Sequence, residues 1–193
     1  MQNPATTDDP LLAYAGDFYP NKDRILAAIL FLMQIRPGIS QYQVVKSVFL
    51  ADKAHLNSVG RPVTFDKYVA MKQGPVPSLV YALLMDSLVF VRIYRRSPPW
   101  RVESAKNSNR YHALETPDAT ALSITDKNAL RAGLEMVLRL SYKELSARLH
   151  DDPAYVEAWG RRGRAASVPM KAVKLLEDEN EEKILDLADI SYP

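Results

Sequence analysis

Asp52 and His55 stand three positions apart in the segment VFLADKAHL, whose apolar residues recur at helical spacing. Side chains three positions apart lie one turn apart on a helical face, so the pair can share a proton or a metal ion. The alternative is a structural polar clip, in which Asp52 accepts hydrogen bonds from backbone N–H groups or from Arg61 and holds a neighbouring loop. A polar pair on a partly buried face costs free energy unless both members are hydrogen-bonded, so the sequence favours the clip over catalysis.

The other histidines and the cysteine count do not support a metal centre or a nucleophile. The chain has three histidines, His55, His112 and His150, and none has the HExxH or closely spaced pattern of a zinc site. It has no cysteine, which excludes disulfides and thiolate sites and fits a reducing cytoplasm. His150 precedes Asp151 and Asp152 in the last turn of a predicted helix, and we interpret it as a further member of the polar clip. The sequence therefore predicts a protein with no metal, no cofactor and no catalytic residues.

Composition is that of one domain with short appendages. The chain has 193 residues, of which 47% are hydrophobic and 25% charged, enough for one hydrophobic core. Its longest apolar run, at 25–33, is too short to span a bilayer, so we expect a soluble, cytoplasmic protein without membrane contact. A formal net charge of +2 is too small to indicate nucleic-acid binding by the whole surface. We predict a loosely ordered arm over 1–21, the domain over 22–168 and an acidic helix or tail over 169–193.

Start and stop signals predict two helices in the N-terminal third. A helical apolar face begins near Lys22, and the Pro-Gly dipeptide at 37–38 ends it. Ser40 and Gln43 have the spacing of a capping box, in which a hydroxyl and an amide satisfy backbone N–H groups at a helix start. The second helix should then end at Gly60.

A strand, a bend and a third helix are predicted next. The segment VTFDKYVAM at 63–71 is typical of a strand, and GPVPS at 74–78 predicts a rigid bend from strand to helix, because glycine permits unusual dihedrals and proline fixes them. Apolar periodicity predicts a helix over 78–86, followed by a hairpin over 89–104 and a further strand at 111–114. This order is that of a winged-helix module.

Two more capping boxes predict a helical C-terminal half. Ser123 pairs with Asp126, and Ser141 pairs with Glu144, while the Asp-Pro pair at 152–153 begins another helix. The predicted fold class is α+β and predominantly α-helical: a helical core, a small antiparallel sheet or hairpin in a winged-helix-like N-terminal half, and a C-terminal helical cap.

A winged helix raises the alternative of a DNA-binding transcriptional regulator. The predicted third helix, SLVYALLMDS, has no Arg, Lys, Asn or Gln to contact a base edge in the major groove, which argues against sequence-specific readout. A basic hairpin favours phosphate contact. The candidate nucleic-acid contacts are Arg92, Arg95, Arg96, Arg101 and Arg110.

The run at 49–84 resembles the Panacea domain, the SocA-like antitoxin domain of bacterial toxin-antitoxin systems and their phage relatives. The resemblance is carried by ADxxHL at 51–56, GRP at 60–62, the strand FDKYVA and the bend GPVPS. Downstream, ELSARLHDDPAYVEAW at 144–159 is similar to the second helical segment of the family. The similarity covers about 22–165.

The resemblance implies a non-enzymatic antitoxin that neutralises a cognate, adjacently encoded toxin by direct binding. An adaptor that delivers the bound toxin to a protease is a variant of this function, and an antitoxin of this kind can also bind its own promoter. Neither the toxin nor an oligomeric state follows from the sequence.

On this reading, the rigid bend preserves a recognition surface, although it can equally be a determinant of the fold. Trp159 is either core or a partner anchor, and the apolar residues of the acidic tail either dock on the domain or contact a basic toxin. The predicted toxin-binding residues are Tyr68, Lys72, Pro75, Val76, Pro77, Tyr81, Trp159, Leu176 and Ile184.

Overall fold

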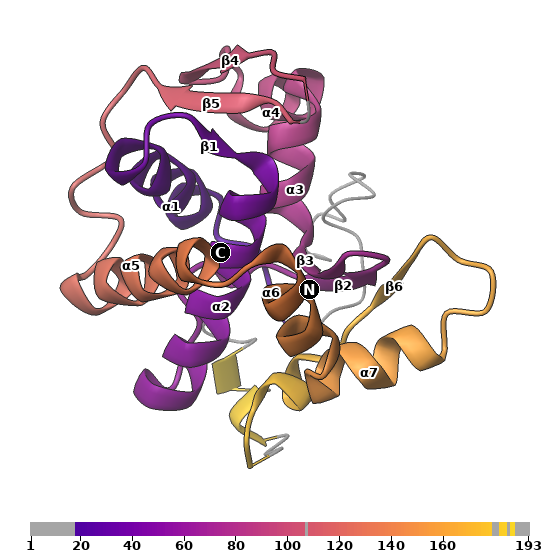
Figure 1. Cartoon of the computed structure of the whole chain (residues 1–193). Helices are drawn as coiled ribbons and strands as arrows, with labels where there is room; N and C mark the ends of the chain where they lie inside the picture. The colour runs from indigo at the N-terminus through magenta and orange to yellow at the C-terminus, as the bar shows by residue number, and fades with distance from the viewer. Residues whose placement is uncertain (1–17, 107, 179–181, 185, 188–193) are drawn as a thin grey trace, which may run out of the picture.

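Helices supply most of the architecture, and two small antiparallel sheets complete it (Figure 1). The computed structural model describes residues 18–106, 108–178, 182–184 and 186–187. The predicted class, α+β and predominantly helical, is confirmed. Its elements are α1 (Lys22–Ile35), β1 (Ile39–Ser40), α2 (Gln41–Val59), β2 (Tyr68–Met71), β3 (Gly74–Pro77), α3 (Ser78–Met85), α4 (Ser87–Tyr94), β4 (Trp100–Glu103), β5 (Arg110–Ala113), α5 (Ile124–Arg139), α6 (Tyr142–His150), α7 (Pro153–Gly160), β6 (Ser167–Pro169) and the 3-10 helix η1 (Ala172–Leu175).

The predicted helix boundaries are confirmed where a side chain caps the helix. Ser40, Ser123 and Ser141 each form a complete capping box at the start of α2, α5 and α6. Asp152 accepts hydrogen bonds from the first backbone N–H groups of α7. Gly60 ends α2 with φ at 92°, a left-handed conformation that glycine adopts without strain.

The first sheet gives the N-terminal half a winged-helix-like topology. Its strand order is β1-β5-β4, and β1 lies between α1 and α2 in the chain. The strand predicted at 111–114 is confirmed as β5. The hairpin predicted over 89–104 is wrong in its first arm, because residues 87–94 form α4: Asp86 caps this helix and Phe90 is its buried contact with the core. The hairpin consists instead of β4 and β5.

The second sheet has the order β3-β2-β6 and joins the two strands that precede α3 to a strand that follows α7. It was only partly predicted. The predicted strand over 63–71 is shorter than expected and begins at Tyr68, because Phe65 has a φ of 55°, outside the extended region. The prediction that GPVPS forms a bend is corrected as well. Residues 74–77 form strand β3, which pairs with β2, and α3 follows directly at Ser78. Strand β6, antiparallel to β2 on its other side, was not predicted.

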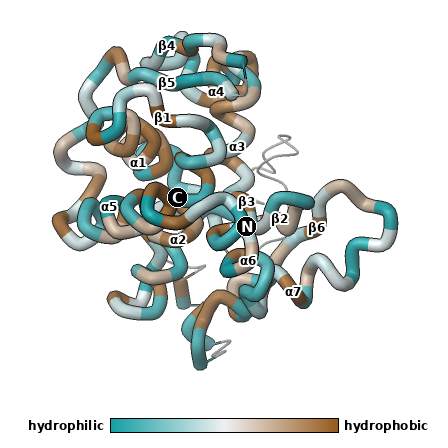
Figure 2. Tube along the Cα trace, viewed as in Figure 1, coloured by the Kyte–Doolittle hydropathy of each residue, from teal (hydrophilic) through white to brown (hydrophobic). Residues whose placement is uncertain are grey.

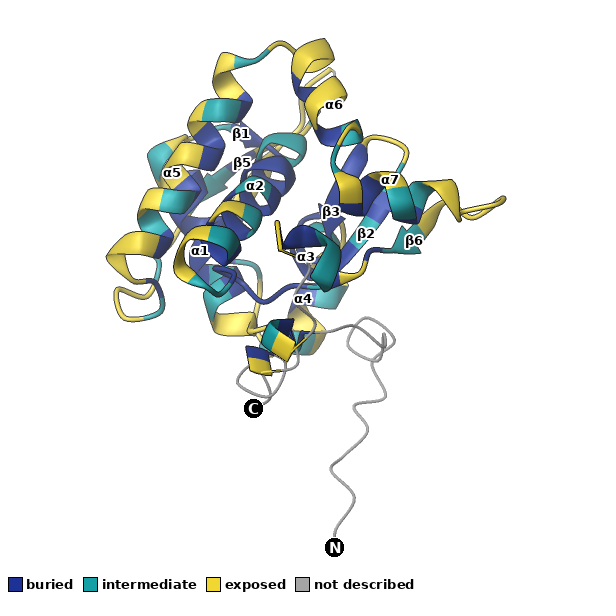
Figure 3. Ribbon diagram, turned by 90° about the horizontal axis from the view of Figure 1, so that it is seen from below, coloured by how far each residue is buried: buried dark blue, intermediate teal, exposed yellow. Residues whose placement is uncertain are grey.

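Helix α2 lies between two hydrophobic clusters. One cluster packs α1, α2, α3 and α5 with the first sheet; α1 contributes a long apolar stretch and is coloured largely hydrophobic in Figure 2. The other packs α2 with α6, α7 and η1. Figure 3 shows α1, α2 and α5 side by side with their facing sides buried. None of the described helices is long and apolar enough to cross a membrane.

Candidate functional site

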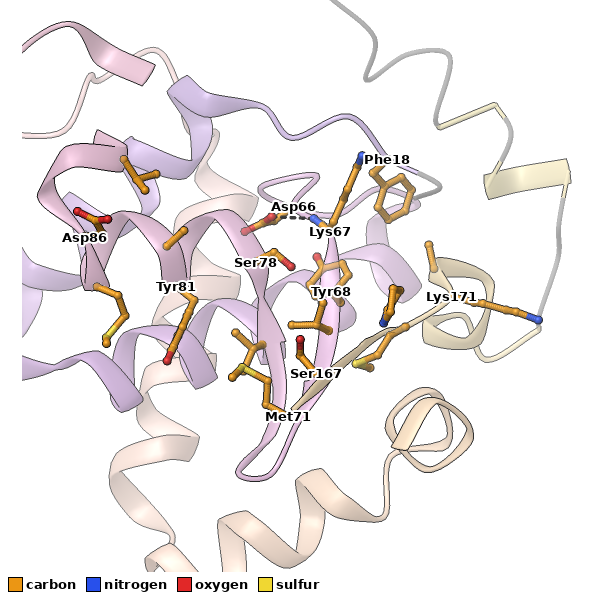
Figure 4. A pocket seen from close by; sticks show the side chains of 18 of the residues that line it. Phe18, Asp66, Lys67, Tyr68, Met71, Ser78, Tyr81, Asp86, Ser167 and Lys171 are labelled. Atoms are coloured by element: carbon orange, nitrogen blue, oxygen red, sulfur yellow. Dashed lines mark hydrogen bonds between the residues drawn. The ribbon is translucent and has the colours of Figure 1, made fainter. Parts of the chain in front are cut away.

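A groove of about 540 Å³ runs between α3 and the sheet β3-β2-β6 (Figure 4). Its lining is mostly apolar, which is the usual character of a surface that binds a partner or ligand. One wall is the outward face of α3, and the other is built by β2, β6 and the start of η1. The apolar and aromatic side chains that line it are Phe18, Tyr68, Val69, Met71, Val76, Tyr81, Ala82, Met85, Val89, Pro169, Met170 and Ala172.

Asp66 fixes the α3 wall of the groove. The residue before α3, Pro77, has no side chain that can cap the helix. Asp66 supplies the cap from a distance, accepting hydrogen bonds from the backbone N–H groups of Leu79 and Val80 at 2.9–3.0 Å. Burial raises the pKa of this fully buried carboxyl to about 7, although the backbone hydrogen bonds oppose the rise. The position of α3 therefore depends on a residue outside the helix.

Tyr68 is held at the floor of the groove by a buried carboxylate. Its hydroxyl donates to Asp52 at 2.7 Å, and Asp52 also accepts from the backbone N–H of Thr64 at 2.9 Å. Burial raises the pKa of Asp52 and raises that of Tyr68 well above 10. Asp52 thus makes the backbone contact that the sequence suggested, but it does not bind Arg61. Tyr68 is only 3% exposed, and its ring packs edge-on against Phe49 with centroids 5.9 Å apart, so it supports the groove from the core.

His55 and Arg61 belong to a different cluster, centred on Asp126 of α5. Arg24 and Arg61 donate to the Asp126 carboxylate at 2.7 and 2.9 Å. His55 Nδ1 lies 2.7 Å from the Arg61 carbonyl, and Nε2 lies 3.1 Å from the hydroxyl of Thr125. Burial alone would raise the pKa of Asp126, but hydrogen bonds from Arg61, Ser123 and Arg24 outweigh it and lower the pKa to about 2. The cluster ties α1, α2 and α5 together.

The Asp52 and Asp126 clusters have the character of structural networks. His55, Arg61 and Asp126 do not line the groove, and within the described residues no group of three or more His, Asp or Glu side chains is placed to hold a metal ion. His150 lies apart from both: its ring stacks on Tyr155 with centroids 4.8 Å apart, and its Nε2 has no hydrogen-bond partner among the described residues.

The residues predicted for toxin binding fall into two groups. Those of the bend gather at the groove: Tyr68, Val76 and Tyr81 line it, and Lys72 is exposed on the adjoining turn between β2 and β3. The two prolines of β3, at 75 and 77, are buried.

The other predicted residues lie away from the groove. Trp159 is half-buried on α7, stacked on Tyr155 and covered by the guanidinium of Arg162 at 4.1 Å from the ring centroid. Leu176 and Ile184 are only 4% and 3% exposed and pack in the second hydrophobic cluster. The described part of the tail therefore docks on the domain, which was one of the two alternatives considered.

Sequence reasoning missed the second wall of the groove. Met170 and Pro169 come from β6 and the residue after it, about one hundred positions from the β2 residues that they face. A three-residue strand carries no periodic signal. Met85 was detectable, because it ends the apolar run of the predicted third helix; it is 57% exposed at the end of α3.

The arginines proposed for nucleic-acid contact are exposed at the α4, β4 and β5 end of the molecule. Arg96 pairs with Glu115 at 2.7 Å, Arg101 lies 3.7 Å from Glu103, and Arg110 donates weakly to the Gly38 carbonyl at 3.5 Å. Arg95 is the left-handed cap of α4, with φ at 56°. Arg92 lies on the same helix.

The family model of the SocA-like antitoxin, Panacea domain, matches residues 44–155. The chain belongs to this family. The matched segment begins in α2, includes α3 and both strands β2 and β3, and ends in α7. The Panacea match thus covers the α3 wall of the groove but not β6 or η1. No curated protein and no solved structure matches the chain.

Proposed function

We propose that this chain is an antitoxin that neutralises a cognate, adjacently encoded toxin by binding it directly in the cytoplasm, and that the groove beside α3 is the contact surface. Membership of the SocA-like antitoxin family supports an antitoxin role in general. The proposal involves no catalytic step, because the buried carboxylates nearest the groove are engaged in holding α3 and Tyr68.

The apolar outward face of α3 is the observation that carries this proposal. One side of α3 is buried in the core, yet Tyr81, Ala82 and Met85 on the other side line the groove. Val89 of α4 also lines the groove, and Leu88 and Val91 of the same helix are 75% and 42% exposed. An apolar groove of this kind marks an interaction surface, and aromatic side chains at the centre of such a surface contribute most of the binding free energy.

Charge around the groove indicates the chemistry of the partner. Lys67, Arg161 and Lys171 are among the lining residues, and Glu157 pairs with Arg161 at 3.0 Å and lies 3.9 Å from Lys171. The two lining acids have other roles, because Asp66 caps α3 and Asp86 caps α4. The charges that line the groove are thus largely engaged within the chain, so we expect the toxin to present chiefly apolar side chains to it.

The test is co-expression with the adjacent open reading frame, followed by co-purification and measurement of the dissociation constant. Tyr81→Ala should weaken the complex by about thirtyfold, the effect of losing a central aromatic contact, and should restore growth arrest. Met85→Asp should do the same, because it places a charge in the apolar surface. Leu138→Asp is the matched control, since Leu138 is 44% exposed near the end of α5 and does not line the groove.

Three outcomes decide the proposal. Growth arrest relieved by the wild-type chain but not by the groove variants supports it. Equal rescue by all variants would place the contact elsewhere, and a harmless neighbour that forms no complex would reject direct neutralisation. A shortened toxin half-life in the presence of the chain would distinguish delivery to a protease from simple occlusion.

The winged-helix-like topology favours one second function, binding of the antitoxin to its own promoter. Exposed arginines at the β4-β5 hairpin can contact phosphates, and such binding should weaken steeply as salt rises. The outward face of α3 offers no base-reading side chain, so we expect little sequence preference. A gel-shift or anisotropy titration of promoter DNA over 50–200 mM salt tests this function.

A further inference from the structure

A second hollow, of about 280 Å³, lies beside the groove, and two of the side chains that line it have buried polar atoms without a hydrogen-bond partner. It is bounded by the first turns of α2, the turn between β2 and β3, and Val76 and Tyr81. Buried Gln41 Nε2 and Tyr42 Oη have no hydrogen-bond partner among the described residues. An unpaired buried donor costs free energy unless a ligand or water satisfies it, so the two atoms indicate a ligand site.

Lys46 adds a buried positive charge to the same hollow. It lines the hollow although it is only 1% exposed, and its Nζ lies 5.5 Å from the centroid of the Tyr42 ring. One of its three N–H groups donates to the Pro75 carbonyl at 2.8 Å. Within the described residues it forms no ion pair. A buried ammonium without a carboxylate is rare, because the desolvation of the charge is left uncompensated.

Among the described residues, the polar groups near this lysine are neutral or cationic. Lys46 lies over the ring of Tyr42, and Tyr142 of α6 lies beside that ring with centroids 5.6 Å apart. Lys72 stands on the adjoining turn, and His150 lies on α6 beside Gly74. Burial lowers the pKa of Lys46 to about 7 and, with Tyr142 nearby, raises that of Tyr42 to about 12. A bound anion would therefore compensate a charge that nothing on these elements now balances.

The rest of the lining selects among anions. Val45, Met71 and Val76 are apolar, which suits a singly charged group on an aliphatic stem better than a strongly hydrated phosphate. Met71, Val76 and Tyr81 line both this hollow and the groove, so the two are continuous. An occupant of the groove can therefore extend a side chain into the hollow.

We propose that this hollow is a binding site for one carboxylate group, and that an Asp or Glu side chain of the toxin supplies it. Lys46, Tyr42 and Gln41 donate to the carboxylate. Binding of a carboxylate is inferred from the hollow alone, whereas the assignment of that carboxylate to the toxin rests on the proposed function.

The first arm of the test uses acetate and the full chain alone. The Lys46 resonance of ¹³C-labelled lysine, identified by its loss in Lys46→Met, is followed during titration with sodium acetate at pH 6.5, with sodium chloride at equal ionic strength as the reference. Acetate should shift this resonance saturably and raise the pKa of Lys46, and affinity should fall about tenfold per pH unit above the pKa of the free chain. Identical responses to acetate and chloride would overturn the site.

Tyr42→Phe is a second variant that keeps this arm decisive if Lys46→Met fails to fold. The variant removes only a buried hydroxyl that has no partner among the described residues, so its stability should be equal to or higher than that of the wild-type chain. It should weaken acetate binding by at least about fivefold, as expected when a hydrogen bond to a charged group is lost. An unchanged affinity would remove Tyr42 from the site and contradict the proposed geometry.

The second arm measures the dissociation constant of the toxin complex for Lys46→Met and for Lys143→Met, an exposed lysine on α6. Loss of at least tenfold in affinity for the first variant alone supports a toxin carboxylate. Acetate binding with an unchanged complex would overturn the toxin as the source and assign the site to a free carboxylate. Absence of any complex with the wild-type chain would reject the proposed function, whereas the acetate arm would still decide the site.

Discussion

Substitution of Gly133 by alanine tests the packing on which both hydrophobic clusters depend. Gly133 is buried in α5 where this helix packs on α2. A Cβ at this position would stand 2.5 Å from the backbone carbonyl oxygen of Ser47 and 3.3 Å from the backbone nitrogen of Ala51. The nearest atoms belong to the main chain of a helix, so no side-chain rotation can relieve the overlap, and α2 or α5 must move.

The expected magnitude follows from two opposing effects. Alanine in place of glycine stabilises a helix interior by up to about 1 kcal/mol. Overpacking a close contact destabilises by about 1–3 kcal/mol or more, and here the upper end applies because α2 packs in both clusters. We expect Gly133→Ala to lower the free energy of unfolding by about 2 kcal/mol, which corresponds to a Tm lower by roughly 4–8 °C for a chain of this size.

Urea denaturation followed by circular dichroism measures this change, and Gly160→Ala is the matched control. Gly160 is also a helical residue, but a Cβ there would have no atom within 4 Å. The control should be neutral or stabilised by about 0.5 kcal/mol. A Gly133→Ala variant as stable as the wild-type chain would refute the close approach of α2 and α5.

Two further predictions concern buried charge. Asp126→Asn should lower the free energy of unfolding by about 3–5 kcal/mol, because it leaves Arg24 and Arg61 without their carboxylate. Glu115→Gln, in an exposed pair, should change it by less than about 1 kcal/mol. Urea denaturation of both variants measures the two changes. Burial lowers the pKa of Lys46 from 10.5 to about 7, so the folded chain should lose stability as pH falls from 10.5 to 7. Lys46→Met should abolish that dependence, and an unchanged stability-pH profile would contradict the burial of the ammonium.

Local signals in the sequence predicted the helix ends well. A capping box involves residues three positions apart, so Ser40, Ser123 and Ser141 indicate helix starts without reference to the rest of the fold. Gly60 ends α2 for an equally local reason. Helix α4 was mistaken for a strand because its β-branched run favours extended structure, whereas Phe90, buried against Tyr94 and Trp100, holds it helical through tertiary contacts.

The candidate site was predictable only on one side. Val76 and Tyr81 were selected from the bend that carries the family resemblance, and both line the groove and the hollow. The facing wall depends on the pairing of Ala70 with Val168, a contact between segments that no local pattern connects. The burial of Lys46 was not predicted for a related reason. It results from the approach of Pro75, which is distant in the chain, and no neighbouring residue of Lys46 indicates it.

The inserted hairpin changes which surfaces the third helix of a winged-helix-like topology can contact. In a DNA-binding module of this type the third helix is free to enter the major groove. Here β2 and β3 precede α3 directly, and Asp66 caps the helix from the segment before β2. The outward face of α3 then forms one wall of an apolar groove whose other wall is the same sheet. A helix with one face in this groove contacts a protein surface more readily than a base edge. We therefore expect toxin binding at the outward face of α3 and phosphate contact at the neighbouring β4-β5 hairpin, where the Tyr111 hydroxyl of β5 donates to the Leu84 carbonyl of α3.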